Sequence, residues 1–236
     1  MRRRSEGVEE SADLVGPKCP WGSEWTAERV IETLEPLASE ERRARLRAVI
    51  AARLGSVTLV MDAPHDPHNG AAVLRTADAF GLPEVNVVLR EETFRIARTV
   101  TRGVERWVDV VVHATPLAAV AALHERGFEL VATHPDGELE PEALATLPRL
   151  ALVVGNEHDG IRRELFDAAR RTVRVPMRGF VESLNMSVAT GILLAAATRG
   201  RPGDLDDRER QRLYAKGLFR SVTRAADVLA ARSPRE

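Results

Sequence analysis

Apolar and polar positions alternate in a regular way between residues 56 and 199. Short apolar runs of strand length recur along this block: SVTLVMD, VNVVLR, VDVVVH, ELVATH, LALVVG and TVRVPM. Between them lie stretches with helical spacing of apolar residues, among them NGAAVLRTADAFG, PLAAVAALHERG and GIRRELFDAARR. A continuous apolar run suits a strand that is buried on both faces, and strands alternating with helices indicate a parallel sheet. We therefore expect an α/β domain with a mostly parallel sheet and helices on both faces.

The two ends of the chain have a different pattern. Residues 1–25 lack periodicity and contain several glycines and prolines, so we expect a flexible leader. Residues 26–55 predict an N-terminal helical arm of two helices, with Thr26 and Ser39 in N-cap positions. After Pro202 and Gly203, a polar helical segment predicts a C-terminal helical extension over residues 200–236. The predicted α/β domain is residues 56–199.

Composition narrows the class of protein. The 236 residues are 44% hydrophobic and 29% charged, which is typical of a globular protein and argues against a disordered or fibrous one. Residues 1–25 contain no apolar core of a signal peptide, so we expect a cytoplasmic protein. The single cysteine, Cys19, excludes an internal disulfide framework and a Cys-rich metal cluster. The histidines are scattered along the chain, and we predict no metal site.

Charge is nearly balanced overall but uneven along the chain. The formal net charge is −1, so a nucleic-acid site must be a local patch. Residues 199–236 carry a local net charge of +4, and arginines cover much of the second helix, between Arg42 and Arg53. These arginines fit either a solvated helix face with Glu–Arg pairs or an RNA-contacting face. The sequence leaves both interpretations open.

Polar residues gather in three loops that follow predicted strands. The first loop, DAPHDPHNG, leads into a helix that carries Asn69 and Arg75; the second, GNEHDGI, contains Gly155, Asn156 and Glu157. The third, VPMRGFVESLNMSVA, places Ser183 and Asn185 before an apolar helix. Each loop alone is explained by helix capping, but the carboxyl ends of parallel strands meet at one edge, where ligands bind. Neither G-x-G-x-x-G nor a dinucleotide fingerprint is present, so a dehydrogenase is disfavoured.

These three ordered motifs resemble the SpoU class of the SPOUT RNA methyltransferases, and most closely the TrmH type that 2′-O-methylates a D-loop guanosine of tRNA. The resemblance spans about residues 56–199. It implies a trefoil knot near the C-terminal part of the domain, an exception to the rule that chains do not thread loops. It also implies a homodimer and S-adenosylmethionine as the methyl donor, without a metal.

The resemblance also assigns residues to roles. The implied catalytic residues are Arg75, Asn69, Glu157, Ser183 and Asn185. The implied cofactor-binding residues are Thr133, Gly155, Asn156, Glu157, Val175, Met177 and Leu184. Arg75 is the implied activator of the 2′-hydroxyl. Because an arginine side chain stays protonated in proteins, it acts either as an unusual base or as a clamp on the adjacent phosphate.

The predicted RNA substrate depends on the two helical segments at the ends of the chain and on two short stretches of sequence. The helical arms and the stretches HDPHN and RGVERWVDV are similar to TrmH proteins and favour tRNA. We expect RNA contacts from His68, Arg42, Arg45, Arg53, Arg199, Arg201 and Arg210. Two alternatives stay open at this point. One is a 2′-O-methyltransferase acting on ribosomal RNA, and the other is a catalytically idle RNA-binding module of the same fold.

Overall fold

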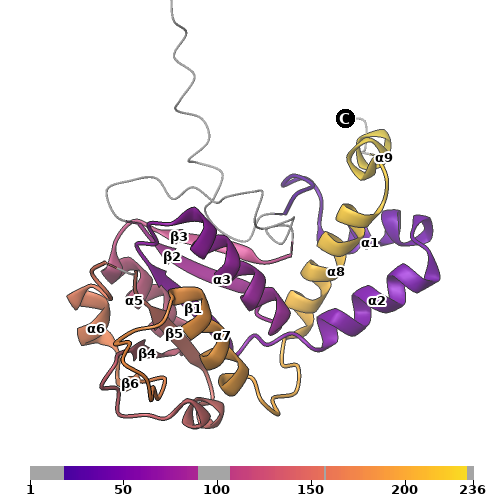
Figure 1. The fold of residues 1–236 in the computed structure, drawn as a ribbon. Helices are drawn as coiled ribbons and strands as arrows, with labels where there is room; N and C mark the ends of the chain where they lie inside the picture. Colours follow the sequence, from indigo (N-terminus) through magenta and orange to yellow (C-terminus); the bar gives the residue numbers. More distant parts are fainter. Residues whose placement is uncertain (1–18, 90–106, 157, 233–236) are drawn as a thin grey trace, which may run out of the picture.

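A computed structural model describes residues 19–89, 107–156 and 158–232 of the chain (Figure 1). Its centre is a sheet of six parallel strands in the order β3-β2-β1-β5-β4-β6. The strands are β1 (Val57–Asp62), β2 (Glu84–Val88), β3 (Asp109–His113), β4 (Glu129–Thr133), β5 (Leu150–Val154) and β6 (Arg171–Val173). The predicted parallel α/β fold is confirmed, although β6 is shorter than the run TVRVPM suggests.

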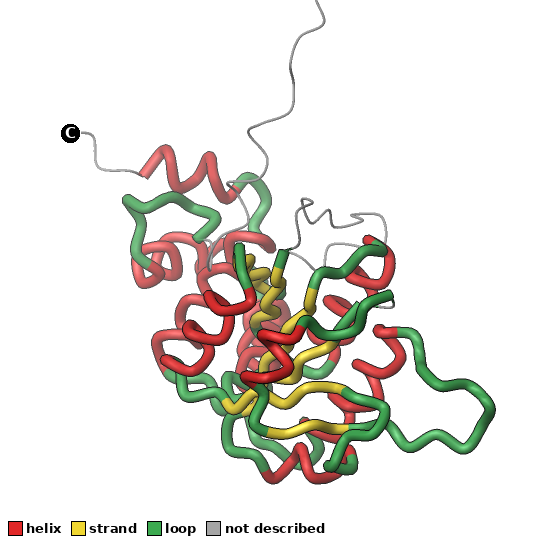
Figure 2. Tube along the Cα trace, turned by 90° about the vertical axis from the view of Figure 1, so that its left-hand side faces the viewer, coloured by secondary structure: helices red, strands yellow, loops and turns green. Residues whose placement is uncertain are grey.

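Helices cover both faces of this sheet (Figure 2). One face carries α3 (Pro67–Ala79), α7 (Met186–Ala197) and the 3-10 helix η4 (Pro141–Thr146); the other carries α5 (Pro116–Glu125) and α6 (Arg163–Ala168). Successive strand residues point to opposite faces. Accordingly Leu59 and Met61 pack with α3 and α7, whereas Val60 packs with α5 and α6. The result is a three-layer arrangement with an aliphatic core on each side.

The short strand β6 lies between β4 and the segment that follows β4. On one edge it pairs with β4, where Thr133 is opposite Val173. On the other edge Leu139, a few residues beyond β4, donates its N–H to the Thr172 carbonyl at 2.9 Å and accepts from the Arg174 N–H at 3.1 Å. The chain that leaves β4 therefore passes around β6. This passage agrees with the expected trefoil knot, which stays a prediction.

The two ends of the chain meet in one body, which we call the helical unit. It comprises α1 (Ala27–Leu34), the 3-10 helix η2 (Glu35–Leu37), α2 (Glu40–Ala51), α8 (Asp207–Ser221) and α9 (Ala225–Arg232), beside the β3 edge of the sheet in Figure 1. Apolar side chains of both ends share one cluster, including Val30 and Leu34 from α1 and Leu218 from α8. The N-terminal arm and the C-terminal extension were expected as separate segments. They fold together because neither can bury its apolar face alone.

Part of the stretch expected to be a flexible leader is packed. Residues 1–18 lie outside the described residues, but Trp21 and Trp25 are buried in the cluster of the helical unit. The Trp21 Nε1–H donates to the Trp25 carbonyl at 3.0 Å, and the Trp21 ring meets Phe219 edge-on. Burial of two indoles explains why residues 19–25 are ordered despite containing one glycine and one proline.

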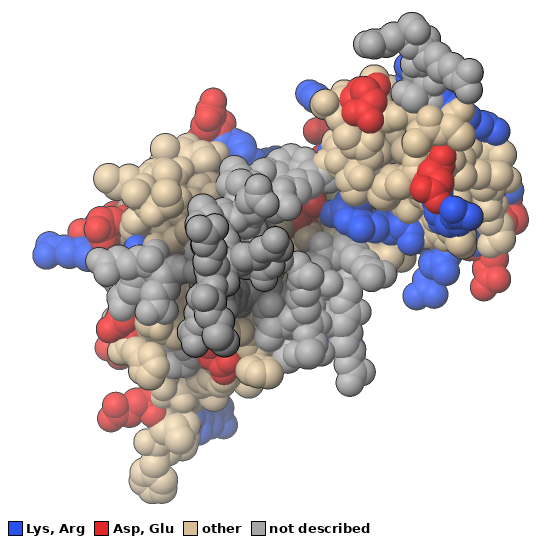
Figure 3. Space-filling view, turned by 90° about the horizontal axis from the view of Figure 1, so that it is seen from above, with Lys and Arg blue, Asp and Glu red and all other residues tan. Residues whose placement is uncertain are grey.

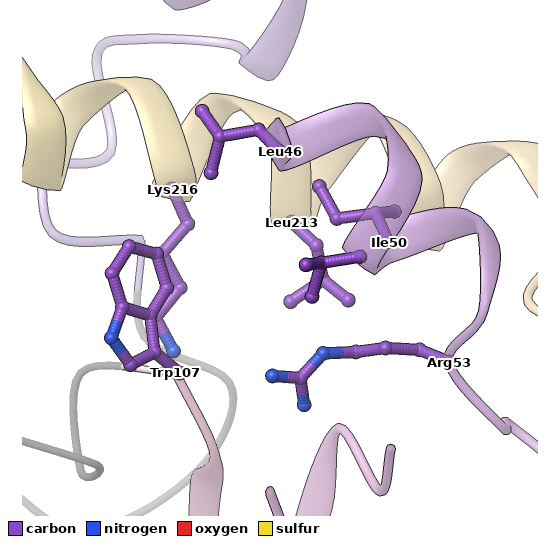
Figure 4. A pocket seen from close by; sticks show the side chains of 7 residues that line it. Leu46, Ile50, Arg53, Trp107, Leu213 and Lys216 are labelled. Carbon is purple, nitrogen blue, oxygen red and sulfur yellow. The ribbon is translucent and has the colours of Figure 1, made fainter. Parts of the chain in front are cut away.

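The helical unit docks against the amino ends of the strands. Asp109, at the start of β3, accepts from Lys216 Nζ at 2.6 Å and from Arg212 Nη2 at 2.6 Å. The Asp204 carboxylate accepts the N–H groups of Gly55 and Ser56, just before β1. A cavity of about 30 Å³ remains at this junction between Trp107, Arg53 and Lys216 (Figure 4). It has room for little more than a water molecule, so it cannot hold a cofactor.

Candidate active site

The strand order reverses between β1 and β5. The chain moves from β1 outward to β2 and β3, crosses to β4 on the other side of β1, returns to β5 beside β1, and ends at β6 beyond β4. In open α/β sheets, ligands bind at the carboxyl ends of the strands beside such a reversal. The first and second polar loops start at this place, after Asp62 and Val154, which end β1 and β5. The sheet thus brings two of the three motifs side by side.

The first loop ends in a well-capped helix. Asp66 is the N-cap of α3, and its Oδ1 accepts the His68 N–H at 2.8 Å; Pro67 occupies the first helical position. Asn69 therefore lies in the first turn and not at the cap. Arg75 lies further along α3 with an exposed side chain, and within the described residues it has no hydrogen bond or ion pair. Its guanidinium is available to a bound partner.

The third loop approaches the first one through a pair of amides. Asn185 is the N-cap of α7: its Oδ1 accepts from the Ser187 N–H at 2.8 Å and from the Ser187 hydroxyl at 2.6 Å. The other half of the same amide, Nδ2, donates to Asn69 Oδ1 at 3.0 Å. Ser183 lies in the same loop and is exposed. The structure thus joins Asn69 and Asn185 directly, across 116 positions of sequence.

The second loop folds back on itself. Asn156 and Gly160 exchange two backbone hydrogen bonds of 3.3 and 3.2 Å, and Asn156 Oδ1 accepts the N–H groups of His158 and Asp159. Gly155 is required here, because a Cβ at this position would lie 2.3 Å from the Gly160 carbonyl carbon. Glu157, expected to be both catalytic and cofactor-binding, lies outside the described residues.

The other expected cofactor residues lie at neighbouring strand ends. Thr133 ends β4, which is next to β5, and Val175, Met177 and Leu184 belong to the loop after β6. Within the described residues, no backbone group of residues 175–184 has an intramolecular hydrogen bond. These free N–H and C=O groups suit a ligand with adenine and amino-acid ends, which hydrogen-bonds to backbone. The chemistry of the donor set therefore fits S-adenosylmethionine.

Two features of the site could not be found from the sequence. Asp62 is completely buried at the end of β1 and forms an ion pair with Arg162, which lies directly before α6. At the rim, His65 Nε2 lies 3.9 Å from Asp159 Oδ2, and the His65 ring faces the His158 ring with centroids 5.4 Å apart. Both features join the first loop to the second. No local sequence signal links residues so far apart.

The residues expected to contact RNA divide into two groups. His68, Arg42, Arg45, Arg199 and Arg210 are exposed. Arg53 is buried, donates to the Leu82 carbonyl at 2.7 Å and pairs with Asp78 on α3. Arg201 donates to the carbonyls of Ala197, Leu144 and Leu147, which end α7 and η4. Arg53 and Arg201 are thus committed to internal carbonyls, and the expectation that they contact RNA is withdrawn.

The surface of the helical unit carries charges of both signs. Lys and Arg side chains lie among Asp and Glu over this part of the molecule (Figure 3). Arg43 pairs with Glu40, and Arg47 pairs with Glu35 and lies over the Tyr214 ring, as the Glu–Arg interpretation of α2 predicts. Arg42 and Arg45 form no ion pair within the described residues. The Glu–Arg interpretation of α2 is therefore confirmed for Arg43 and Arg47, and RNA contact by Arg42 and Arg45 stays a prediction.

Metal-ligand clusters and membrane-spanning helices are both absent from the described part of the chain. No group of three His, Cys, Asp or Glu side chains there could hold a metal ion. None of the helices described is long and apolar enough to cross a membrane.

Known proteins are similar to this chain over the region that contains the sheet and the three polar loops. The SpoU rRNA Methylase family model matches residues 56–195. The tRNA (guanosine(18)-2'-O)-methyltransferase of Escherichia coli (strain K12) is 33% identical over 195 residues, covering 78% of this chain and 85% of the relative. The solved structure of the A. aeolicus TrmH/SpoU tRNA modifying enzyme aligns with a TM-score of 0.69 and 32% identity, over 78% of this chain and 98% of that one.

A ligand-bound structure is also similar. The AdoMet-bound rRNA methyltransferase from Sinorhizobium meliloti aligns with a TM-score of 0.56 and 30% identity, over 65% of this chain and 59% of that one. The similarity therefore extends to proteins named for tRNA and to one named for rRNA.

Proposed function

Because the chain belongs to the SpoU rRNA Methylase family, we propose that it transfers a methyl group from S-adenosylmethionine to a ribose 2′-hydroxyl of tRNA. The proposed target is the guanosine at position 18, in the D-loop, as in the name of the E. coli relative. The observation that carries the proposal is the meeting of the three motif loops at one sheet edge, with Asn185 hydrogen-bonded to Asn69. An RNA-binding module without catalysis has no need of this contact.

We assign different roles to the loops at the carboxyl edge of the sheet. The backbone groups of residues 175–184, with Thr133, Gly155 and Asn156, hold the methyl donor in this proposal. S-adenosylmethionine, when bound, supplies an electrophilic methyl group on a positively charged sulfur. The protein's task is to hold the acceptor oxygen in line with that methyl group and to ease the loss of its proton.

The Arg75 side chain is suited to bind the RNA that accepts the methyl group. Its exposed guanidinium has no partner within the described residues, so it can form two parallel hydrogen bonds to a phosphate. We assign it the clamp on the phosphate beside the target ribose, where its positive charge also favours deprotonation of the hydroxyl. Asn69, Ser183 and Asn185 then orient the ribose, and Glu157 keeps its expected role beside them.

Exposed apolar side chains around α7 support a homodimer. Val188 and Ile192 lie one helical turn apart on α7 and are 50% and 40% exposed, and Phe180 and Val181 in the preceding loop are exposed as well. A second copy of the chain would bury this patch next to the third loop. We therefore propose that the active unit is a dimer with its sites near the interface. We also propose that this dimer acts in the cytoplasm, as expected for a tRNA substrate.

The experiment is incubation of the purified protein with labelled S-adenosylmethionine and either total tRNA or rRNA, followed by nuclease digestion and nucleoside mass spectrometry. We expect 2′-O-methylguanosine in tRNA, mapped to the D-loop. Methylation of rRNA alone would keep the chemistry and change the substrate. No transfer to either RNA would favour the idle binding module.

The variant Arg75→Ala separates catalysis from RNA binding. Under the proposed function, methyl transfer falls by at least a hundredfold while tRNA affinity, measured by filter binding, changes by less than threefold, because most phosphate contacts are elsewhere. Equal loss of binding and transfer would contradict the catalytic role of Arg75 and leave it as an RNA-binding contact alone.

A further inference from the structure

One carboxylate lies at the start of the first loop and binds the end of the second loop. The Asp62 side chain, at the end of β1, is fully buried. Arg162 reaches it twice: its backbone N–H donates to Asp62 Oδ2 at 2.6 Å, and its Nε–H donates to Oδ1 at 2.7 Å. The Arg162 Nη2 lies 2.5 Å from the same Oδ1. Both the main chain and the side chain of Arg162 are therefore fixed to β1.

Folding of the domain does not by itself require this pair. Burial removes the Asp62 charge from water and most of the Arg162 side chain with it, and apolar residues of similar volume in place of a buried ion pair often give an equally stable protein. The strands on either side of Asp62 are held by apolar side chains such as Met61 and Val154. We therefore consider which segments of the chain the Asp62–Arg162 ion pair holds in position.

The pair orients the second loop. Gly155 leaves β5, which is itself paired with β1, so that the start of the loop is fixed by the sheet. The Asn156–Gly160 bridge makes the middle compact. The end is fixed at Arg162, which Asp62 holds. The direction in which this loop projects over the sheet edge is therefore set from β1.

The same carboxylate also adjoins the first loop. Ala63 follows Asp62 with a φ of 45°, a left-handed conformation unusual for alanine, and its N–H donates to the Val88 carbonyl at 2.9 Å. Arg162 Nη2 lies 3.4 Å from that same carbonyl oxygen. From this fixed turn the chain runs to the Asp66 cap and to Asn69 on α3. Arg162 therefore binds Asp62, from which the chain runs to α3, and the Val88 carbonyl, which also accepts from Ala63.

We propose that Asp62 and Arg162 are a positioning pair, which sets the loop that holds the methyl donor relative to the helix that carries Asn69 and Arg75. The inference rests on the proposed function for the identity of the donor. It predicts that the pair acts on affinity for S-adenosylmethionine and on the rate of transfer. It predicts no effect on tRNA affinity, because the exposed arginines of the helical unit lie at the opposite ends of the strands.

The test is a neutral pair variant, Asp62→Asn with Arg162→Met. Asparagine keeps an oxygen for the backbone N–H of residue 162, and no unpaired charge stays buried. We expect a melting temperature close to that of the wild type, at least tenfold weaker binding of S-adenosylmethionine by calorimetry, and a similar loss of transfer rate. A merely structural pair would show none of this loss once stability is retained.

A matched control exists at the other end of α3. Arg53 and Asp78 also form a partly buried Arg–Asp ion pair, and the variant Asp78→Asn with Arg53→Met removes it in the same way. We expect S-adenosylmethionine affinity in this control to stay within twofold of the wild type. Equal weakening in both variants would overturn the proposal, because it would indicate a general effect of lost stability.

A second variant covers failure of the neutral pair to fold. Asp62→Glu keeps the charges but moves the carboxylate by one methylene, so the loop shifts while the ion pair persists. We expect weaker S-adenosylmethionine binding here as well. Wild-type affinity in Asp62→Glu or in a folded neutral pair would refute the positioning role. If the wild-type protein itself binds no S-adenosylmethionine, the proposed function fails instead, and the two failures are distinguishable.

Discussion

Single side chains at the site each make separable contacts. Asn185 uses its amide oxygen to cap α7 and its amide nitrogen to bond Asn69. The capping contact is a matter of helix stability, whereas the contact with Asn69 joins two motif loops. A substitution that removes only one of these two contacts can therefore separate its effect on activity from its effect on stability.

Asn185→Asp is that substitution. Aspartate caps a helix as well as asparagine does, so we expect an unchanged midpoint of thermal unfolding, but it has no N–H for Asn69. Methyl transfer should fall at least tenfold. Asn185→Ala removes both contacts and should also cost about 1 kcal/mol of stability. Full activity in Asn185→Asp would show that the contact with Asn69 has no catalytic importance.

Protonation of His113 should make the free energy of unfolding depend on pH. Burial lowers its pKa below the ordinary value of 6.5, and its Nε2 lies 2.8 Å from Asn86 Oδ1. Below pH 6.5 the unfolded chain therefore binds more protons than the folded one, so stability is present at neutral pH and is lost as the pH falls.

The measurement is urea unfolding at pH 7.5 and pH 5.5. We expect a lower free energy of unfolding at pH 5.5 in the wild type, and a smaller difference in His113→Gln. The other five histidines are exposed, which makes His113 the main contributor of this residue type. An identical pH dependence in the variant would contradict the assignment.

At the scale of elements, the sequence pattern predicted most of the fold. Each apolar run became a strand, and the caps at Thr26, Ser39 and Asn185 were indicated by residue type. Two elements deviate. β6 ends at Val173 and is held between β4 and the segment around Leu139, and η4 was not anticipated. Their form depends on partners distant in sequence, which periodicity does not report.

The crossing of the C-terminal segment over α2 is a contact between elements that can be tested. Gly203 packs against the end of α2, where a Cβ would lie 1.8 Å from the Ala51 carbonyl oxygen. Gly203→Ala should therefore force the two segments apart and cost about 1–3 kcal/mol in urea unfolding. Gly179→Ala is the control, since nothing lies within 4 Å of its added Cβ. Equal stability of both variants would contradict this packing.

On the scale of the whole molecule, the proposed tRNA surface and the sheet edge with the site are separate. Deleting the C-terminal helices would not test the surface, because α1 and α2 would lose the apolar partners that α8 provides. Substitution of exposed arginines avoids this problem.

The triple variant Arg42→Ser, Arg45→Ser, Arg210→Ser should bind tRNA more weakly and with a smaller dependence on salt. Each lost phosphate contact lowers the slope of log affinity against log salt by about one. Arg171→Gln, on the edge strand farthest from the helical unit, is the control. A slope unchanged by the triple variant would remove the helical unit from the RNA interface.

The sequence indicated the position of the three loops better than it indicated the partners of the arginines. Three polar loops at strand ends were expected at one edge because parallel strands share a direction, and the sheet places them there. Arg53 and Arg201 were misjudged, since an arginine in a helical pattern gives no sign that it will bond internal carbonyls. The Asp62–Arg162 pair was missed for the same reason: a contact across 100 positions is a property of the fold.

The helical unit also has a consequence for biosynthesis. Its first two helices leave the ribosome before the strands of the sheet, whereas α8 begins about 155 residues after α2 ends. At about 5–20 residues per second, Val30 and Leu34 wait roughly 10–30 s before the side chains that cover them exist. The nascent chain therefore exposes an apolar helix face throughout translation of the sheet. Ribosome-associated chaperones that recognise such faces should bind this protein at its N-terminal end and leave only when its last helices appear.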